Sequence, residues 1–223
     1  MKVTANPERT KQLIESLQVA NAKKDSERQG IHCADLTLCN RQSAFKRIIP
    51  KAATETMLGY FVDGARRDYA LKELFKGKIE TKQFHDVYFT PDALDAEGCP
   101  VEFKTTRAKN DIPNHYVTQL KYYVALLGKL KGTLIIQRIA PGVKIPFESY
   151  ELNITDPELV GILQEIDERR SNLQLALDIK SPETAMSVWT DKELNWLCRN
   201  CQWADECSKM IHAGVVKVEA PAE

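Results

Sequence analysis

A chain of 223 residues in which 31 basic side chains balance 31 acidic ones has no overall charge to attract a polyanion, so a nucleic-acid surface would have to be local. Apolar residues make up 43% of the chain, which is enough to form a core. The sequence has no run of about 18 apolar residues, the length needed to span a membrane. The segment from Met1 to Gly30 lacks the apolar centre of a signal peptide. We therefore expect a cytoplasmic protein of one domain, or one domain with a small elaboration, whose cysteines are metal ligands or free thiols rather than disulfides.

The first third of the sequence is predicted to be mainly helical. A weak amphipathic helix is expected over 7–28, an irregular segment over 30–39, and a basic stretch over 41–47. A longer helix is expected over 54–75, because large apolar side chains recur there at near-helical spacing and Gly77 follows, as glycine commonly does at a helix end.

Two strands are expected next, over 83–90 and 100–106, because both segments are rich in Val, Tyr, Phe and Thr. Between them lies the sequence Asp-Ala-Glu-Gly at 95–98, which is typical of a turn. The pattern predicts one antiparallel hairpin made of these two strands.

The remaining elements alternate between helix and strand. A helix is expected over 116–127, strands over 133–139 and 147–154, and a helix that begins at the cap-then-proline pair Asp156-Pro157 and continues to about 179. This order indicates an α/β fold, a mixed central sheet flanked by helices.

The sharpest chemical signal is Asp92 followed by Glu102-Phe103-Lys104. Side chains alternate along a strand, so Glu102 and Lys104 are expected on one face and Phe103 on the other, while a hairpin would bring Asp92 beside Glu102. Two carboxylates with a cation beside them suit a Mg²⁺ or Mn²⁺ site for phosphodiester hydrolysis, in which Lys104 orients a metal-activated water and stabilises charge on the phosphate. The alternative is an ordinary hairpin with charges on its wet face.

A second pair of residues extends this pattern. Gln119 and Tyr123 are four apart on the expected helix and so share a face. With Asp92, Glu102 and Lys104 they resemble the PD-(D/E)xK nuclease superfamily, which has a restriction-endonuclease-like core, and its RecB-like branch in particular. The resemblance implies that the carboxylates bind the metal, Lys104 is catalytic, and Gln119 and Tyr123 help to position DNA; otherwise Tyr123 is a half-buried aromatic.

One further metal ligand, often a histidine after a glycine on the first core helix, is usual in that family. This sequence has Asp68 at the matching offset after Gly64, on the helix face shared by Phe61 and Ala65. A carboxylate can replace imidazole for a hard cation, so Asp68 is predicted as a metal ligand. The alternative is a surface ion pair between Asp68 and Lys72.

Four of the six cysteines form a plausible metal-binding set. Cys198, Cys201 and Cys207 have C-x₂-C-x₅-C spacing, and Cys39 is a remote fourth thiol, which suits either Zn²⁺ or an iron–sulfur cluster. One cysteine before the nuclease core and three after it resembles the iron–sulfur clasp of RecB-like nucleases, and on a small chain it is most similar to the fourth CRISPR-associated (Cas) exonuclease family.

That resemblance implies a 4Fe–4S cluster in preference to a 2Fe–2S cluster, exonuclease activity on single-stranded DNA, and processing of DNA for spacer acquisition with the CRISPR integrase complex as a partner. It divides the chain into an N-terminal helical region (1–50), a RecB-like core (51–180) and a C-terminal cluster region with a tail (181–223). A centre joining Cys39 to Cys198 would close a loop of about 160 residues and constrain the unfolded chain by roughly 4–5 kcal/mol, by analogy with a disulfide.

The other cysteines and histidines carry weaker expectations. Cys33 is an alternative cluster ligand to Cys39, and Cys99 is expected to be a free thiol in the hairpin turn. The four histidines have no recognisable metal spacing and are expected to be scattered over surface and core: His32, His85, His115 and His212.

Local basic side chains are candidates for phosphate contacts if the fold gathers them around one cleft. They are Arg41, Lys46, Arg47, Lys104, Arg107, Lys109 and Lys121. Trp189, Trp196 and Trp203 either stack on single-stranded bases or, for at least two of them, pack around the cluster. Two other functions stay open: a non-catalytic iron–sulfur DNA-binding or adaptor subunit, and a zinc-stabilised interaction module.

Overall fold

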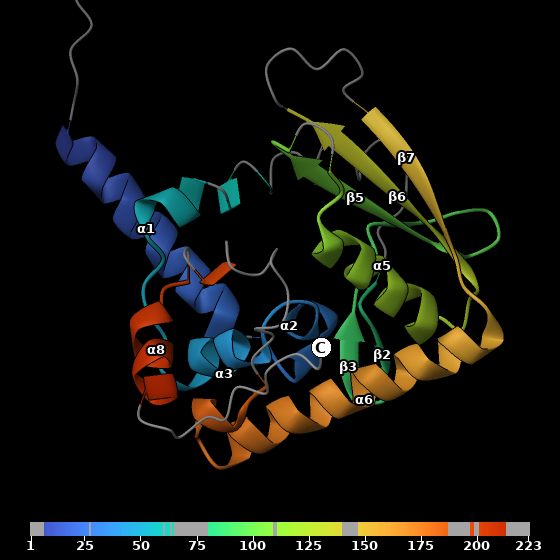
Figure 1. Cartoon of the computed structure of the whole chain (residues 1–223). Coiled ribbons are helices and arrows are strands. Elements are labelled where there is room, and N and C mark those ends of the chain that lie inside the picture. Colours follow the sequence, from blue (N-terminus) through green and yellow to red (C-terminus); the bar gives the residue numbers. More distant parts are fainter. Residues whose placement is uncertain are drawn as a thin grey trace, which may run out of the picture.

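The computed structural model describes residues 7–26, 28–59, 61–62, 64, 80–108, 111–139, 147–186, 197–198 and 201–212. These residues form an α/β fold in which helices flank two small sheets (Figure 1). None of the described helices is both long enough and apolar enough to cross a bilayer.

The larger sheet is mixed, as the order of elements predicts. It contains β4 (Ala93–Leu94), β5 (Pro100–Thr106), β6 (Lys131–Arg138) and β7 (Phe147–Asn153), in that order. β5 runs parallel to β6, and the two outer strands are antiparallel to their neighbours. A parallel pair requires a crossover connection, and helix α5 provides it here.

Helix α5 (Asn114–Leu126) covers one face of this sheet. Leu120 and Val124 pack there on Leu134 and Ile136 of β6. The two elements approach each other closely at Gly132, where an added Cβ would lie 2.7 Å from Val124 Cγ2. Only glycine leaves room for the helix at this crossing.

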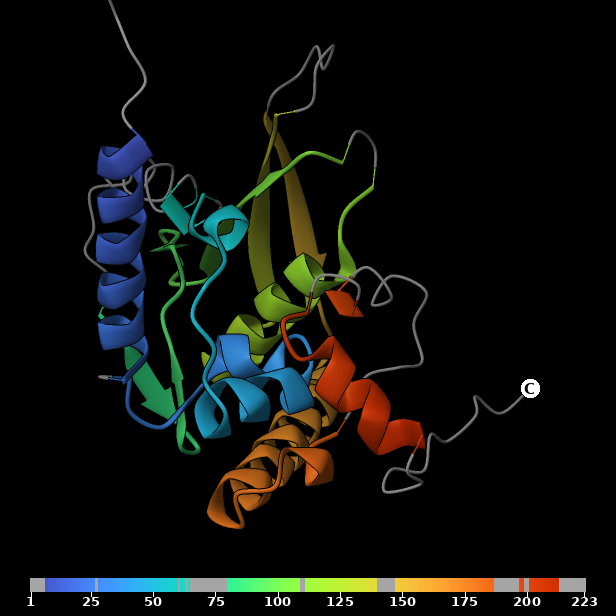
Figure 2. The same cartoon turned by 90° about the vertical axis from the view of Figure 1, so that its left-hand side faces the viewer.

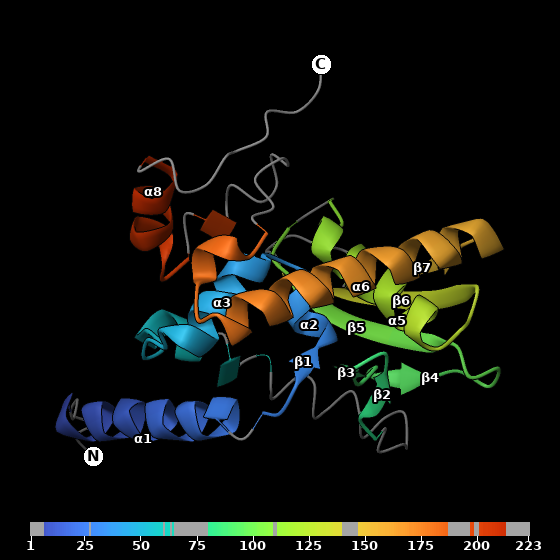
Figure 3. The ribbon, with the colours of Figure 1, turned by 90° about the horizontal axis from the view of Figure 1, so that it is seen from below.

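The opposite side of α5 packs on the long helix α6 (Asp156–Asp178), so α5 lies between the sheet and α6 (Figures 1 and 3). Tyr122 and Leu126 of α5 and Ile166 and Leu173 of α6 belong to the main core cluster. α6 begins in a capping box in which the Thr155 hydroxyl accepts from Glu158 N and the Glu158 carboxylate accepts from Thr155 N at 2.7 Å. The cap is therefore Thr155, and the prediction of Asp156 as the cap is wrong by one residue.

The N-terminal region joins the same core. It contains α1 (Pro7–Ser26), β1 (Ile31–His32), α2 (Cys33–Leu36) and α3 (Asn40–Ile48), so the expectation of an irregular segment over 30–39 is wrong. α3 lies against α6, where Asn40 Nδ2 donates to Arg169 O at 2.8 Å. α1 lies on the outside of the molecule (Figure 2).

The expected hairpin between 83–90 and 100–106 is also wrong. β3 (Val87–Phe89) pairs instead with β2 (Lys82–Phe84) and, in parallel, with β1, forming a separate three-stranded sheet. The turn between β2 and β3 is His85-Asp86, whose φ angles of 47° and 60° are those of a two-residue hairpin turn, but without the glycine that usually reveals one. The turn at 95–98 joins β4 to β5, and Asp95 Oδ1 accepts there from Cys99 N at 2.8 Å.

The helix expected over 54–75 is described only in part. Residues 55–59, 61–62 and 64 are helical, and the rest of that segment lies outside the described residues.

Candidate active site and metal centre

β5 carries the two central side chains of the candidate active site. Glu102 and Lys104 lie on the face of β5 toward α5, and Lys104 Nζ is 2.5 Å from Glu102 Oε1. Phe103 lies on the opposite face with Val101 and Ala93. Strand alternation thus pairs Glu102 with Lys104 as the sequence predicts.

Asp92 approaches the same point from the segment between β3 and β4, not from a hairpin of the two strands expected over 83–90 and 100–106. Its Oδ2 accepts from Phe103 N at 2.8 Å, which holds the Asp92 carboxylate against β5. Burial raises the pKa of Glu102 to about 8; Lys104 opposes this shift, and the neighbouring Asp92 carboxylate adds to it. The two carboxyl groups are therefore close enough to interact.

Glu102 has one oxygen with no hydrogen-bond partner among the residues that the structure describes. The residue is 1% exposed, its Oε1 is paired with Lys104, and its Oε2 is buried without a partner in the described part of the chain. A buried carboxylate oxygen without a partner is costly. A divalent cation held between Glu102 and Asp92 would remove that cost, so the two residues fit a Mg²⁺ or Mn²⁺ ion.

Lys104 is partly buried among groups that keep it protonated. Burial lowers its pKa, but the Glu102 and Asp92 carboxylates outweigh burial and the net pKa is raised. Its Nζ lies 5.7 Å from the centre of the Tyr116 ring. Lys104 is therefore a fixed cation and hydrogen-bond donor rather than a proton acceptor.

The α5 pair is in contact. Gln119 Nε2 donates to the Tyr123 hydroxyl at 2.8 Å, as their shared helix face predicts. Tyr123 is 5% exposed, so it is buried rather than half-buried. Burial raises its pKa, and the next cause is the charge of Glu102, which shows that Tyr123 faces the carboxylate site.

Three neighbours of this site escape sequence reasoning. Cys33 is 1% exposed, and Glu102 is the main charged group that raises its pKa after burial. His115 and Tyr116 adjoin Lys104 at the start of α5; burial, and then Lys104, lowers the pKa of His115 to about 4. Periodicity hints at Tyr116, three residues before Gln119 on the same helix, but no sequence signal places Cys33 here.

The third predicted metal ligand, Asp68, lies outside the described residues, as does its alternative partner Lys72. Within the described ranges, no three His, Cys, Asp or Glu side chains are grouped closely enough to surround one metal ion.

The four predicted cluster cysteines line one small cavity of about 70 Å³. They come from three places: Cys39 precedes α3, Cys198 and Cys201 precede α8 (Ala204–His212), and Cys207 lies within α8. All are free thiols in the structure, as is Cys99, which is buried just after its turn. Cys33 is not a wall of this cavity, so it is not an alternative to Cys39.

Direct contacts between side chains and backbone dock the C-terminal segment on the N-terminal region. Trp203 is 3% exposed, stacks with Phe45 and donates from Nε1 to Ile49 O at 2.9 Å. Lys51 Nζ pairs with Glu206 Oε1 at 2.6 Å. Trp203 therefore packs beside the cysteine cavity, and Trp189 and Trp196 lie outside the described residues.

Arg41 also lines the cysteine cavity. It is 2% exposed, with Nε donating to Ala185 O at 3.2 Å and a guanidinium nitrogen donating to Cys207 Sγ at 3.5 Å. The prediction of a DNA contact for Arg41 is therefore wrong, because its side chain is enclosed. A buried guanidinium requires negative charge nearby, which deprotonated thiols would supply. The chemistry of the donor set therefore suits a thiolate-bound centre, but the described thiols are not grouped closely enough to surround one ion.

The other basic residues predicted to contact phosphates differ in how exposed their side chains are. Arg47 Nη2 forms an ion pair with Asp35 Oδ2 at 2.6 Å. Lys46, Arg107 and Lys121 are exposed, and Lys109 lies outside the described residues.

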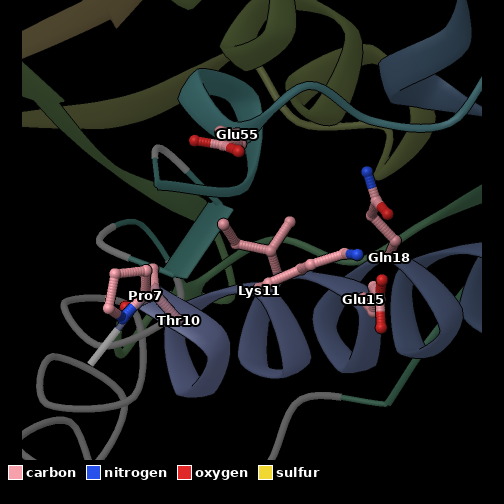
Figure 4. Close-up of a pocket in the computed structure, with 7 residues that line it drawn as sticks. Pro7, Thr10, Lys11, Glu15, Gln18 and Glu55 are labelled. Carbon is pink, nitrogen blue, oxygen red and sulfur yellow. The ribbon is translucent and has the colours of Figure 1, made fainter.

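A separate groove of about 500 Å³ lies between α1 and the segment at Glu55 (Figure 4). Its charged side chains, Lys11, Glu15 and Glu55, are exposed and typical of solvated surface. It lacks the buried, unpartnered oxygen that marks the Glu102 site.

The chain is similar to proteins of known structure, one of them with a TM-score above 0.5. The crystal structure of SSO0001 covers 89% of this chain and 95% of its own, with a TM-score of 0.57 and 19% identity, which shows a shared fold alone. A phage-related exonuclease from Haemophilus somnus 129PT has a TM-score of 0.46 at 11% identity, covering 68% of this chain and 96% of its own. The alkaline exonuclease LHK-Exo from Laribacter hongkongensis has a TM-score of 0.42 at 12% identity. The match covers 63% of this chain and 80% of LHK-Exo. No protein-family model and no curated protein matches the sequence.

Proposed function

We propose that this chain is a Mg²⁺- or Mn²⁺-dependent deoxyribonuclease of the RecB-like type that hydrolyses phosphodiester bonds. The observation that carries the proposal is the buried Glu102 Oε2, which has no hydrogen-bond partner within the described residues. It belongs to a carboxyl group that interacts with Asp92 and pairs through Oε1 with the Lys104 ammonium. A carboxylate pair with one unused oxygen and an adjacent fixed cation is suited to hold a divalent ion against a phosphate.

In this proposal Asp92 and Glu102 hold the metal, and Asp68 is the third ligand. The ion would supply Lewis-acid polarisation of the phosphate and a lowered pKa of a bound water. Lys104, protonated, orients the attacking water and stabilises charge that develops on the phosphate oxygens. Gln119 and Tyr123 position the substrate strand against these groups.

For the substrate, we propose single-stranded DNA cleaved as an exonuclease, with the fourth CRISPR-associated family's role in spacer acquisition and the CRISPR integrase as a partner. This assignment is supported by the joint pattern of Asp92, Glu102, Lys104 and the four cysteines. The exposed Arg107, just after β5, is a local cation for phosphate contacts, whereas Lys121 lies near Glu158 at the start of α6.

For the cysteine cavity, we propose an iron–sulfur cluster, 4Fe–4S in preference to 2Fe–2S, ligated by Cys39, Cys198, Cys201 and Cys207. Four thiols on one cavity wall and the enclosed Arg41 guanidinium support a negatively charged thiolate centre. Its role would be structural, because the cavity is lined by residues from both ends of the chain and lies beside the Trp203 and Lys51 contacts that join them.

The test of the nuclease is a cleavage assay with Mn²⁺ on single-stranded and duplex DNA labelled at either end. Lys104→Ala should abolish cleavage while far-UV circular dichroism and the unfolding midpoint stay close to wild type. The matched control is Lys131→Ala, which removes an exposed lysine of the same sheet that pairs with Glu97. Full activity of Lys104→Ala would reject the assignment, and DNA retention without cleavage by wild type would indicate a non-catalytic binding subunit.

The test of the cluster is separate. Anaerobically purified wild-type protein should absorb near 400 nm and contain iron and sulfide, and Cys201→Ser should lose the absorbance, whereas Cys99→Ser should keep it. A colourless protein that contains zinc would overturn the iron–sulfur proposal and favour a zinc-stabilised module.

A further inference from the structure

Lys104 has a second neighbour that does not depend on the carboxylates. Its Nζ pairs with Glu102 Oε1, and it also lies over the face of the Tyr116 ring at 5.7 Å from the centre. That distance is within the range of about 6 Å at which an ammonium is attracted to the negative face of an aromatic ring. Tyr116 is half-buried, which strengthens the attraction by excluding water.

Tyr116 is itself held firmly. Its hydroxyl donates to Thr105 O at 3.0 Å, on the residue that follows Lys104 in β5. Its ring packs against the cluster of Leu120, Val124 and Ile136 between α5 and the sheet. The ring therefore has a fixed position relative to the strand that carries the lysine.

The two sources of attraction respond differently to a metal. The Lys104 ammonium is faced by Glu102 on β5, Asp92 before β4, and His115 and Tyr116 on α5. A divalent cation between Glu102 and Asp92 would neutralise the two carboxylates that hold the ammonium. The Tyr116 ring has no net charge to lose, so its attraction to Lys104 would persist.

We propose that Tyr116 is a positioning residue whose ring keeps the Lys104 ammonium in place once a divalent cation has bound the Glu102 carboxylate. The role rests on the proposed nuclease function. A lysine on a flexible four-carbon stem would otherwise swing toward solvent at the moment when the substrate phosphate needs it. Tyr116 lies outside the Gln119–Tyr123 pair and acts on the lysine rather than on the substrate.

The experiment uses two substitutions and two measurements on the full chain. Tyr116→Phe keeps the ring and removes the hydroxyl bond to Thr105, and Tyr116→Leu removes both. The first measurement is NMR of protein labelled with ¹³C at the lysine ε-carbon, with and without Mg²⁺, in which the Lys104 signal is assigned by Lys104→Arg. Protons over a ring face resonate upfield, so this signal reports the contact without any need for activity.

In wild type and Tyr116→Phe we expect an upfield Lys104 signal that remains upfield in Mg²⁺, and in Tyr116→Leu a signal at the position of exposed lysines. The second measurement is cleavage, in which Tyr116→Leu should lower kcat tenfold or more with KM within threefold and shift the alkaline limb of the pH profile to lower pH. Tyr116→Phe should stay within threefold of wild type. Tyr88→Leu is the matched control, since that ring stacks on His32 in the other sheet.

An ordinary Lys104 shift in wild type with Mg²⁺, or wild-type kcat in Tyr116→Leu, would overturn the proposal. Equal losses in Tyr116→Phe and Tyr116→Leu would also overturn it, because they would assign the effect to the hydroxyl. If wild type cleaved no DNA, the nuclease function would fail while the NMR result would still decide whether the ring holds the ammonium.

Discussion

Glu102→Gln should stabilise the metal-free protein while it abolishes cleavage. The pKa of Glu102 is about 8 in the folded chain, whereas a freely solvated glutamate, which represents the unfolded chain, has a pKa of 4.5. Because the folded value is the higher one, the associated stability is fully present below pH 4.5 and is lost as the pH rises through 8. The difference between the two pKa values of Glu102 corresponds to about 5 kcal/mol of unfolding free energy. About 3 kcal/mol of that stability is lost by pH 7.

Glutamine has no proton to lose, so Glu102→Gln avoids this penalty. Part of the gain is offset because Lys104 Nζ exchanges the Glu102 carboxyl for a weaker amide acceptor, a loss of about 1 kcal/mol for one hydrogen bond. At pH 7 in EDTA we therefore expect the variant to be about 2 kcal/mol more stable than wild type, with the difference growing between pH 5 and 8.

The assay is denaturant unfolding in EDTA from pH 5 to 8.5, followed by DNA cleavage in Mn²⁺. The matched control is Glu151→Gln, an exposed carboxylate on β7, whose stability difference from wild type should not vary over this range in the same way. A stability difference between Glu102→Gln and wild type that stays constant with pH would refute the raised pKa, and retained cleavage would refute the metal-ligand role.

Three further predictions follow from the same structure. Because a metal must displace the Glu102 proton, the affinity for Mn²⁺ measured by calorimetry should rise about tenfold per pH unit below pH 8 and level off above it; a flat profile would exclude Glu102 as a ligand. Gly132→Ala would place a Cβ 2.7 Å from Val124 Cγ2 and 2.9 Å from Leu120 Cδ1, so denaturant unfolding should show a loss of about 1–3 kcal/mol, and no loss would mean that α5 does not cross β6 so closely. Trp203→Ala should loosen the C-terminal segment by about 3 kcal/mol, seen as faster limited proteolysis within residues 201–212, and unchanged proteolysis there would contradict the docking contacts.

Local chemistry explains which parts of the fold are predictable. The alternation that pairs Glu102 with Lys104 and the four-residue spacing of Gln119 and Tyr123 are properties of single elements, and both appear in the structure. The hairpin escapes prediction because His85 and Asp86 adopt positive φ without a glycine to signal the turn.

Long-range partners explain the rest. The burial of Arg41 depends on Ala185 and Cys207, which lie far away in sequence, so a basic residue after a cysteine resembles a surface cation until the fold is known. The same holds for Cys33, which reaches Glu102 only because β1 and α2 pack into the main core. No local pattern in either segment contains that information.

The docking of the C-terminal segment on residues 40–53 has a consequence for synthesis on the ribosome. Helix α3 needs α6 and Trp203 as packing partners, so the N-terminal region cannot complete its core while it emerges. Translation covers the roughly 160 residues from Cys39 to Cys198 at about 5–20 residues per second, which leaves the first thiol without its partners for roughly 10–30 s. Nascent chains are thus exposed to aggregation and thiol oxidation during that interval, and reducing conditions with a chaperone that binds unfolded chains are those under which this protein should accumulate in folded form.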